Sequence, residues 1–379
     1  MSLLHPQHRC SPIRRLADPS PSWQLSRSLE RERELTARLF FRREHEEPAR
    51  EISAPVISAG VFYGFVAQVA IGTPSTMQTV LIDSTASFSW IQCEPCSSIT
   101  TCYDQDGPFF NPDNSKTYRK LPCLSLSCLR AVGNTSDRGP CQDEEDRCLY
   151  YMKYMDGSAS FGRVGTDTLT FGEEAIPGFV FGCSNYHIGE FGRYMGIFGF
   201  AASGQLSILS QVGRRKTGQY QALSYYLPSP TSVGYIQVGR YDEDELDFTP
   251  MFRNGSDNYI ALTSIMVDGY AIELTGSSLS PRTMAMPCYL DLGTSFTVLP
   301  NQTFRNLRDA VTKRTKGYDR IQSTRGCCEP AFLSTERVIL AVQLHFRNGV
   351  RLQLDEKKLM YKGRDGRLCL GSHQAKGIC

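Results

Sequence analysis

The stretch that decides the fold is "VLIDSTASFSWIQCEPC", residues 80–96, in which a run of aliphatic residues leads directly into an aspartate and a series of small polar residues. A second stretch, "CYLDLGTSFTVLP" at residues 288–300, repeats this arrangement. Aligned without a gap on Asp83 and Asp291, the two stretches share the aspartate, a serine and a phenylalanine. The chain therefore carries one motif twice, once in each half.

The size and composition of the chain are those of a globular protein with two lobes. It has 379 residues, of which 41% are hydrophobic and 21% charged, and this length suffices for two cores. The formal net charge of +2 gives no support for a nucleic-acid partner. No apolar run approaches the roughly 20 residues of a membrane-spanning helix, and the opening "MSLLHPQHRC" lacks the apolar core of a secretory signal. We expect neither a nucleic acid nor a membrane as a partner.

The cysteines indicate an oxidising compartment, although the first ten residues do not resemble a secretory signal. Half of the fourteen cysteines cluster in one turn-rich segment, as Cys93, Cys96, Cys102, Cys123, Cys128, Cys141 and Cys148. Such a cluster is typical of a loop-rich subdomain held by disulfides. Cys93-Glu-Pro-Cys96 also has the spacing of a zinc-ligand pair, but no second pair answers it and no histidine lies within the cluster. We therefore favour disulfides over a zinc site, and expect a protein that is extracellular or in the secretory pathway.

The composition and the pattern of apolar and turn residues divide the chain into three segments. Residues 1–52 are rich in arginine and acidic residues at helix-forming spacing, and composition alone favours a solvated tail there over a basic prosegment. Short β-type runs bounded by Gly, Pro and Asn then follow one another and resume after a proline-bearing joint at residues 225–234. The clearest helical signal is "NQTFRNLRDAVTKRT", directly after Pro300. We predict an all-β or mainly-β chain with a few short helices, and two lobes over residues 53–228 and 229–379.

The two aspartates indicate a catalytic pair. A strand that delivers an aspartate into a small-residue turn is costly unless the carboxylate is used or well bonded, and a single copy is more simply explained as an Asx-turn. Two copies change this, because joining the halves about a pseudo-twofold axis would bring both carboxyls to one interface. Two carboxyls that share a site cannot both ionise easily, so one keeps a proton. Such a pair can activate a water as general base and protonate a leaving group as general acid, and amide hydrolysis by this route needs no metal and no cofactor.

Five stretches extend the pattern: "FVAQVAIGTPSTMQTVLID", "WIQCEPC", "YMKYMDGSASFGRVGTDTLTF", "GCSNYHIGEFGRYMGIFGFAASGQLSILSQ" and "YLDLGTSFTVLP". With them, most of the chain resembles the pepsin-like aspartic proteases, in particular the plant nepenthesin-like branch. The third stretch is similar to the family's flap hairpin, and the fourth to the hydrophobic-hydrophobic-Gly segment that threads under the first aspartate. The charged start is similar to the branch's prosegment. The resemblance implies a bilobed, pepsin-like acid protease fold with a cysteine-rich insertion in the first lobe.

By this resemblance, Asp83 and Asp291 are the catalytic pair of an aspartic endopeptidase, made as a zymogen and either secreted or vacuolar, that cleaves polypeptides at acid pH as a monomer. Tyr154, with Gly157 and Ser158, would form the flap over the substrate. On alternation alone, Tyr154 in "YYMKYM" is more simply a strand-packing residue. The residues that would support the active site are Ser84, Thr85, Gly293 and Thr294. The resemblance adds further disulfide candidates, namely Cys183, Cys327 and Cys369.

Both aspartate motifs depart from the family's Asp-Thr-Gly-Ser pattern. At the first motif Thr85 replaces the glycine, and Ala86 removes a hydroxyl that should donate to Asp83. We therefore expect this carboxylate to be short of donors, at a cost of roughly 1.5–3 kcal/mol for one charged hydrogen bond. At the second motif Leu292 stands where a hydroxyl is usual. The sequence given also lacks the family's second hydrophobic-hydrophobic-Gly segment, which predicts weak support for Asp291.

These departures keep a second hypothesis open. In it, the chain is a binding or inhibitor protein on a protease scaffold, without the chemistry, as relatives resembling xylanase inhibitors are. An Asp83→Asn change separates the two hypotheses, because only a protease would lose its activity. A zinc or redox role of Cys93 and Cys96 is a more distant third reading. Other hydrolase and nucleotide-binding classes have little support, since the chain has no Gly-x-Ser-x-Gly elbow and no phosphate-binding glycine loop.

Overall fold

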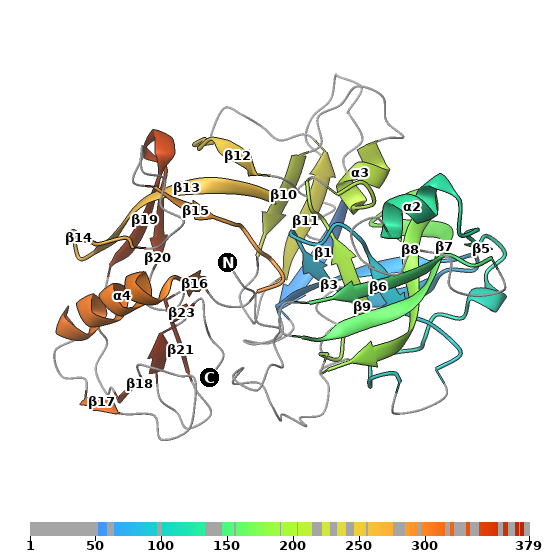
Figure 1. Cartoon of the computed structure of the whole chain (residues 1–379), viewed down its shortest axis with the longest axis horizontal. Coiled ribbons are helices and arrows are strands. Elements are labelled where there is room, and N and C mark those ends of the chain that lie inside the picture. Colours follow the sequence, from blue (N-terminus) through green and yellow to red (C-terminus); the bar gives the residue numbers. More distant parts are fainter. Residues whose placement is uncertain are drawn as a thin grey trace. The chain divides into compact units, whose positions relative to one another are not determined.

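The computed structural model describes most of the chain between residues 52 and 374. The described residues are 52–58, 64–96, 101–132, 146–154, 157–189, 191–202, 204–213, 222–227, 233–239, 246–254, 257–275, 285–294, 297–314, 319–321, 331–333, 341–354, 359–362, 368–370 and 372–374. They form two compact units (Figure 1). The N-terminal unit comprises the described residues up to 239 together with Asp291–Gly293, and the C-terminal unit comprises the others. Of the predicted prosegment, only Ile52 is described, and the predicted lobe boundary at residue 228 remains a prediction.

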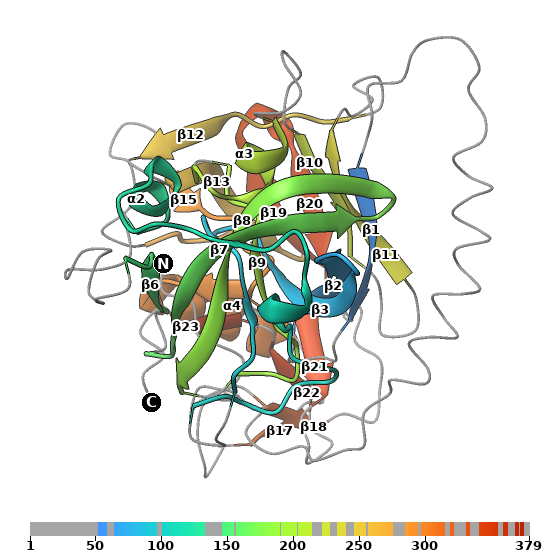
Figure 2. The same cartoon turned by 90° about the vertical axis from the view of Figure 1, so that its right-hand side faces the viewer.

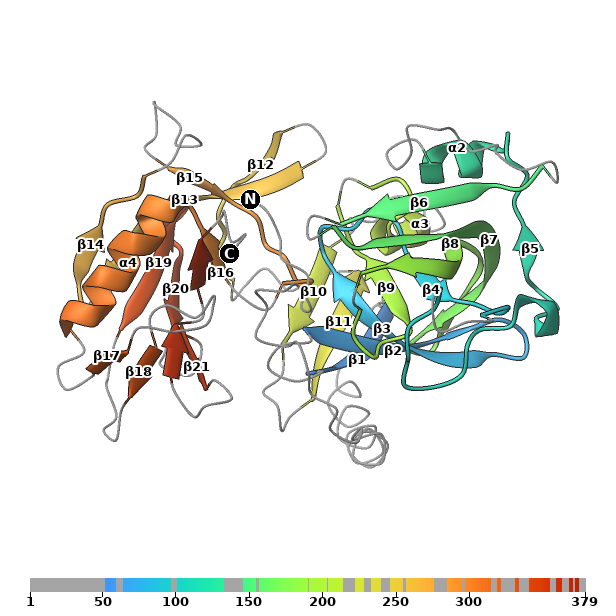
Figure 3. The same ribbon diagram turned by 60° about the horizontal axis from the view of Figure 1, so that its bottom comes forward.

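One large mixed sheet makes up most of the N-terminal unit (Figures 1 and 2). Its eleven strands are β1 (Ile52–Ser58), β2 (Phe65–Ile71), β3 (Thr76–Asp83), β4 (Trp90–Gln92), β5 (Arg119–Lys120), β6 (Leu149–Lys153), β7 (Ala159–Phe171), β8 (Glu174–Ile188), β9 (Gly196–Gly199), β10 (Ala222–Tyr226) and β11 (Val233–Gly239). They lie in the order β10-β11-β1-β2-β3-β9-β4-β8-β7-β5, and β6 pairs with β7. An additional pairing of β2 with β7 curls the sheet (Figure 3). The helices of this unit are short, namely η1 (Pro112–Asn114), α2 (Leu126–Val132) and α3 (Ile208–Gly213).

The second half of strand β3 is buried on both faces, which explains the aliphatic run at residues 80–82 directly before Asp83. Because successive residues of a strand face opposite sides, Val80 and Ile82 enter one buried cluster and Leu81 enters another. All three side chains are almost fully buried. Packing on both faces fixes the end of β3, and Asp83 is its last residue.

Strand β9 passes between β3 and β4, beneath the first aspartate motif. It runs parallel to β3 with Gly199 opposite Asp83, and the N–H of Phe200 donates to the carbonyl oxygen of Asp83 (2.8 Å). A β-carbon on Gly199 would lie 2.4 Å from the carbonyl oxygen of Ala86, so the close passage requires glycine. The predicted hydrophobic-hydrophobic-Gly thread under the first aspartate is confirmed.

The C-terminal unit contains smaller sheets and one long helix. Its strands are β12 (Met251–Asn254), β13 (Asp257–Val267), β14 (Tyr270–Ile272), β15 (Met286–Cys288), β16 (Thr297–Leu299), β17 (Asp319–Ile321), β18 (Ala331–Leu333), β19 (Val342–Phe346), β20 (Arg351–Leu354), β21 (Met360–Lys362), β22 (Leu368–Leu370) and β23 (Ser372–Gln374), with a short helix η2 (Arg347–Gly349). One sheet has the order β12-β13-β19-β20 with β14 and β15 also on β13, a second pairs β16 with β23, and a third has the order β17-β18-β22-β21.

Helix α4 (Asn301–Arg314) packs on this unit by one apolar stripe (Figure 1). Its buried residues include Phe304, Leu307 and Val311, which are three and four positions apart and so share one face of a helix. They join the apolar cluster that β13 and β19 contribute to. The helix predicted after Pro300 is therefore confirmed, and so is the prediction of a mainly-β chain with a few short helices.

Candidate active site

Asp83 is held at the end of β3 by three hydrogen bonds to one carboxylate oxygen. Its Oδ1 accepts from the N–H of Thr85 (2.8 Å), from Thr85 Oγ1 (2.7 Å) and from the N–H of Ala86 (3.0 Å). The side chain is 8% exposed, and such a burial of a carboxylate requires donors of this kind. With Oδ1 engaged, Oδ2 is the oxygen that remains for other contacts.

The expectation that Asp83 is short of donors is wrong. Ala86 does lack the hydroxyl of the family pattern, but its backbone N–H still reaches the carboxylate. The missing hydroxyl donor is supplied by Thr85, one position earlier in the turn. The β-branched residue that replaces the family's glycine thus brings the donor that Ala86 has lost.

The second aspartate lies in the segment Asp291–Gly293, which packs with the N-terminal unit. The N–H of Gly293 donates to Asp291 Oδ1 (2.8 Å), as in an Asx-turn. The N–H of Leu292 donates to Ser84 Oγ (2.9 Å), so the serine after the first aspartate bonds directly to the second motif. The Leu292 side chain is buried in the apolar cluster that also contains Ile82. Leu292 therefore anchors this segment by burial, at the position where the family has a hydroxyl.

Both carboxyl groups lie close to Gly293. A β-carbon built on it would be 3.1 Å from Asp83 Cγ, 3.2 Å from Asp83 Oδ2 and 3.2 Å from Asp291 Oδ1. Both carboxyls therefore border the same point, and the structure brings together the two aspartates that the repeat predicts. The absent side chain of Gly293 leaves the space between them open.

For the peptide cleavage that the resemblance implies, we expect Gly293→Ala to lower kcat by about 10- to 100-fold, because a methyl group would displace both carboxyls by a few tenths of an ångström. The thermal midpoint should change little, since the three atoms nearest to the added carbon belong to side-chain carboxyls and not to the backbone. Peptide-cleavage kinetics and a thermal melt of the same preparation check this expectation. Unchanged kcat in the alanine variant would show that the reacting atoms do not lie at this point.

The flap prediction concerns a turn between β6 and β7. Lys153 of β6 pairs with Ala159 of β7, the N–H of Tyr154 donates to the carbonyl of Ser158 (2.8 Å), and the N–H of Gly157 donates to the carbonyl of Tyr154 (3.0 Å). Gly157 has φ of +87°, a conformation that favours glycine. The residues Tyr154, Gly157 and Ser158 thus form a closed hairpin turn, as the resemblance implies.

The Tyr154 side chain is directed toward the first aspartate motif. Its hydroxyl accepts a hydrogen bond from Trp90 Nε1 (2.6 Å). Burial raises the pKa of Tyr154 well above its usual value of 10, the hydrogen bond from Trp90 opposes this, and the charge of Asp83 raises the pKa further. Tyr154 therefore keeps its phenolic proton. Sequence reasoning did not single out Trp90, because a tryptophan in an apolar strand carries no signal that separates a site residue from a core residue.

Thr294 does not take the supporting role predicted for it. Its hydroxyl is buried and has no hydrogen-bond partner within the described part of the chain. Asp291 Oδ1 is instead bonded by the backbone of Gly293. Of the four predicted support residues, Ser84, Thr85 and Gly293 contact the two aspartate motifs.

The cysteine-rich segment is held by disulfides. The described pairs are Cys93–Cys183, Cys96–Cys102 and Cys128–Cys148, and Cys123 is also disulfide-bonded. Among the other candidates, Cys141 and Cys327 lie outside the described residues, and Cys369 lies in β22. Cys93 and Cys96 therefore each belong to a different disulfide, which leaves no place for the zinc or redox pair considered from their spacing.

His187 on β8 is a buried histidine whose ring packs against that of Trp90. Its Nδ1 is 3.2 Å from the carbonyl oxygen of Thr101, and because a carbonyl only accepts, Nδ1 carries the proton in this contact. Nε2 then faces Ser184 Oγ at 2.9 Å. Burial lowers the pKa of His187 to about 4, and the hydrogen bond to Thr101 raises it by a smaller amount.

This histidine should make the unfolding free energy pH-dependent. The unfolded chain takes up a proton at His187 near pH 6.5, whereas the folded chain takes it up only near pH 4. Stability is therefore complete above pH 6.5 and falls as the pH is lowered, by about 3 kcal/mol at pH 4. The unfolding free energy, measured with denaturant at pH 7 and at pH 4, should fall by about 3 kcal/mol less in His187→Gln than in the parent protein. An equal fall in the two proteins would show that His187 is protonated without penalty.

The described residues contain neither a metal-type cluster nor a membrane-type helix. No group of three or more His, Cys, Asp or Glu side chains is arranged there to hold a metal ion. None of the helices in the same residues has the length and apolar character needed to cross a membrane.

Two family models match the chain. One, described as "Xylanase inhibitor N-terminal", covers residues 65–240, and the other, "Xylanase inhibitor C-terminal", covers residues 258–376. The aspartic proteinase nepenthesin-2 of Nepenthes gracilis is 30% identical over 330 residues, which are 83% of this chain and 71% of that protein. The aspartyl protease family protein 2 of Arabidopsis thaliana is 30% identical over 298 residues, which are 75% of this chain and 58% of its own length.

Solved structures show the same fold. Basic 7S globulin from soybean has a TM-score of 0.66 at 20% identity, covering 86% of this chain and 87% of that one. Conglutin gamma, a basic 7S globulin from lupine seeds, has a TM-score of 0.66 at 17% identity, covering 88% of each chain. At these identities the likeness concerns the fold alone.

Proposed function

The chain belongs to the family of pepsin-like aspartic proteases that includes the nepenthesins and the xylanase-inhibitor-type domains, and on this premise we propose that it is an aspartic endopeptidase. The observation that carries the proposal is that two carboxyls, those of Asp83 and Asp291, both approach to within about 3.2 Å of the point where a β-carbon on Gly293 would lie. Each carboxyl has its own set of donors on Oδ1. This is the arrangement that acid–base hydrolysis of an amide requires.

In the proposed mechanism the two carboxyls share one proton. Both border the same point beside Gly293, and two like charges so close together disfavour double ionisation. The ionised carboxyl takes a proton from a water as it attacks the scissile carbonyl carbon. The protonated carboxyl gives its proton first toward the carbonyl oxygen, and a proton then passes to the leaving amine as the C–N bond breaks. Since Asp83 Oδ1 is fully engaged, Oδ2 is the oxygen of Asp83 that takes part.

Tyr154 completes the proposed site by covering the substrate. Its hydroxyl is held by Trp90, and its ring lies 6.2 Å from that of Phe191. An extended polypeptide is therefore the proposed substrate. We further propose that the chain acts as a monomer, that residues 1–52 are a prosegment, and that the disulfides form in the secretory pathway, from which the protein reaches the vacuole or the outside of the cell.

The test is endopeptidase activity of the full chain with its disulfides formed, on an unfolded, cysteine-blocked polypeptide between about pH 3 and 6, where carboxyls titrate in proteins. We expect new peptides from internal cleavages, identified by mass spectrometry, after a preincubation at acid pH that allows removal of a prosegment. No cleavage, by protein whose near-ultraviolet circular dichroism shows folded aromatic packing, would overturn the proposal.

A second candidate function is binding without catalysis, as an inhibitor-type protein. The observations in its favour are Leu292, which takes the place of a hydroxyl in the second motif, and the family models, which are named for xylanase inhibitors. Under this function, binding to a xylanase measured by calorimetry should be unaffected by Asp83→Asn. Cleavage that depends on Asp83 would exclude it as the main function.

A further inference from the structure

The flap tyrosine depends on Trp90, and Trp90 is enclosed by other rings. Trp90 is fully buried, and its Nε1 must point at the Tyr154 hydroxyl to make the 2.6 Å hydrogen bond. The indole lies 5.1 Å from the ring of His187, 5.5 Å from that of Phe191 and 6.5 Å from that of Tyr103. Two of these rings, those of His187 and Phe191, lie on or just after β8, whereas Tyr103 comes from the cysteine-rich insertion.

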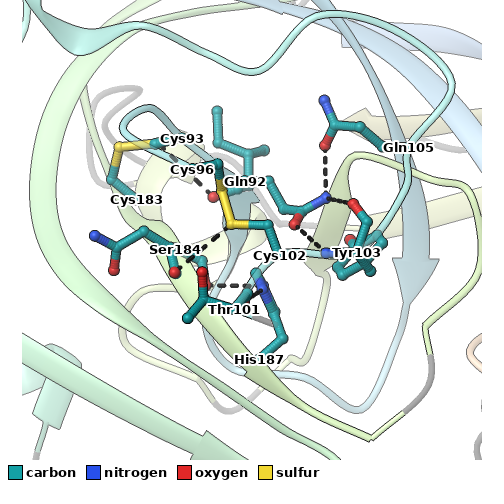
Figure 4. The surroundings of a disulfide bond; sticks show 12 residues. Gln92, Cys93, Cys96, Thr101, Cys102, Tyr103, Gln105, Cys183, Ser184 and His187 are labelled. Carbon is teal, nitrogen blue, oxygen red and sulfur yellow. Dashed lines mark hydrogen bonds between the residues drawn. A yellow bond between two sulfur atoms is a disulfide. The ribbon is translucent and has the colours of Figure 1, made fainter. Parts of the chain in front are cut away.

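Tyr103 is fixed by contacts on three sides. The buried side-chain amide of Gln92 captures its backbone, with Nε2 donating to the Tyr103 carbonyl (3.1 Å) and Oε1 accepting from its N–H (3.1 Å) (Figure 4). The phenol donates to the carbonyl of Tyr194 (2.9 Å). The ring stacks on Phe191 at 5.1 Å with an angle of 19°. These directed contacts hold both the backbone and the ring of Tyr103.

The two residues before Tyr103 are also held. The carbonyl of Thr101 accepts from the backbone N–H of His187 (2.8 Å) and faces its Nδ1. Cys102 is bonded to Cys96, and Figure 4 shows this disulfide between the Gln92 and His187 contacts. The insertion is therefore attached to β4 through Gln92, which bonds to Tyr103 itself, and to β8 through His187, which bonds to Thr101 two residues earlier.

We propose that Tyr103 is a positioning residue of the active site, which keeps Trp90 in the orientation that holds the flap tyrosine. The inference rests on the proposed protease function and adds to it that the cysteine-rich insertion is part of the support of the flap. Its physical basis is that the hydrogen bond from Nε1 has one direction, so a tilt of the indole moves the Tyr154 hydroxyl or releases it. A misplacement of about 1 Å in a catalytic site can cost about 100-fold in rate.

The kinetic test compares three variants of the full chain. Tyr103→Leu should lower kcat by about 10- to 100-fold with a smaller change in KM, because the Tyr154 hydroxyl is then held in the wrong place. Tyr103→Phe, which keeps the stack on Phe191 and loses only the bond to Tyr194, should retain most of kcat. Tyr118→Leu is the matched control, since Tyr118 also lies between two rings, those of Phe110 and Phe181, in the other cluster of this unit.

A second test does not need activity. The chain has two tryptophans, Trp23 and Trp90, so in a Trp23→Phe background the fluorescence reports on Trp90 alone. Tyr103→Leu should shift the emission to longer wavelength and increase quenching by acrylamide, whereas Tyr118→Leu should do neither. Both leucine variants should lose thermal stability to a comparable extent. A difference between them in fluorescence or in kcat therefore cannot come from a general loss of stability.

The outcomes separate this inference from the proposed function. Unchanged Trp90 fluorescence in folded Tyr103→Leu would overturn the inference, whether or not the chain is a protease. An equal loss of kcat in Tyr103→Leu and Tyr118→Leu would also overturn it, because the effect would then be one of general stability. Absence of cleavage by the parent chain would overturn the proposed function alone, and the fluorescence would still decide whether Tyr103 holds Trp90.

Discussion

Asp83→Asn and Asp291→Asn are each expected to abolish peptide cleavage, with kcat lowered by about 1,000-fold or more. An amide neither takes a proton from water at these pH values nor carries an acidic proton to give, so each change removes one half of the acid–base pair. The fold should persist. The amide oxygen of an asparagine at position 83 can still accept the three hydrogen bonds that Asp83 Oδ1 accepts.

The measurement is kcat over pH 3 to 6 for both variants, beside a control that removes a carboxylate elsewhere. Asp309→Asn serves as this control, because Asp309 is an exposed residue of α4 that pairs with Arg308 and exposed pairs contribute little to stability. It should leave kcat unchanged. Retention of cleavage in either active-site variant would remove that aspartate from the mechanism.

Thr85→Val is expected to lower kcat/KM by about 10- to 100-fold. Valine has the shape of threonine, so the change removes the hydroxyl donor to Asp83 (2.7 Å) and little else. The loss of one hydrogen bond to a charged group costs about 1.5–3 kcal/mol, which corresponds to that range of rates if the bond is needed in the transition state. Thr85→Ser, which keeps a hydroxyl, should retain most of the activity.

A second substitution, which restores a hydroxyl donor to Asp83, tests the same expectation. Ala86→Ser, introduced on the Thr85→Val background, would place a hydroxyl at the position of the family pattern, next to an N–H that already donates to the same oxygen (3.0 Å). We expect it to recover a large part of the lost kcat/KM. A Thr85→Val variant as active as the parent would show that two backbone donors suffice for Asp83.

The sequence identified the parts of the molecule whose signal is local and repeated. The two aspartate motifs were found because the same pattern occurs twice, and the order of apolar residues in β3 reflects its burial on both faces. Helix α4 was found from its helix-type sequence directly after Pro300, and its buried residues lie on one face. The thread that contains Gly199 was found from its resemblance to the family's hydrophobic-hydrophobic-Gly segment, and the structure adds the reason for the glycine, since a β-carbon there would lie 2.4 Å from the carbonyl oxygen of Ala86.

Other features depend on contacts between distant parts of the chain. Gln92 and Tyr103 read as an ordinary strand residue and an ordinary loop residue, and nothing in their sequence neighbourhood indicates that they bond to each other. The pairing of Cys93 with Cys183 over 90 residues is likewise set by the sheet, because β4 and β8 lie in parallel with Ile91 opposite Cys183. Residue types alone allow many such pairings, and the fold selects one.

The turn after Asp83 bears on how active relatives are recognised in genomes. A search for the string Asp-Thr-Gly would reject this chain at its first motif. A letter-by-letter comparison with the family pattern would count Thr85 and Ala86 as two unfavourable substitutions. Counted as donors to the carboxylate, the two substitutions offset one another, since three hydrogen bonds reach Oδ1. Degenerate motifs in such genes are better scored by the hydrogen bonds that the turn can still make than by the number of letters that differ, and pairs of neighbouring substitutions should be scored together.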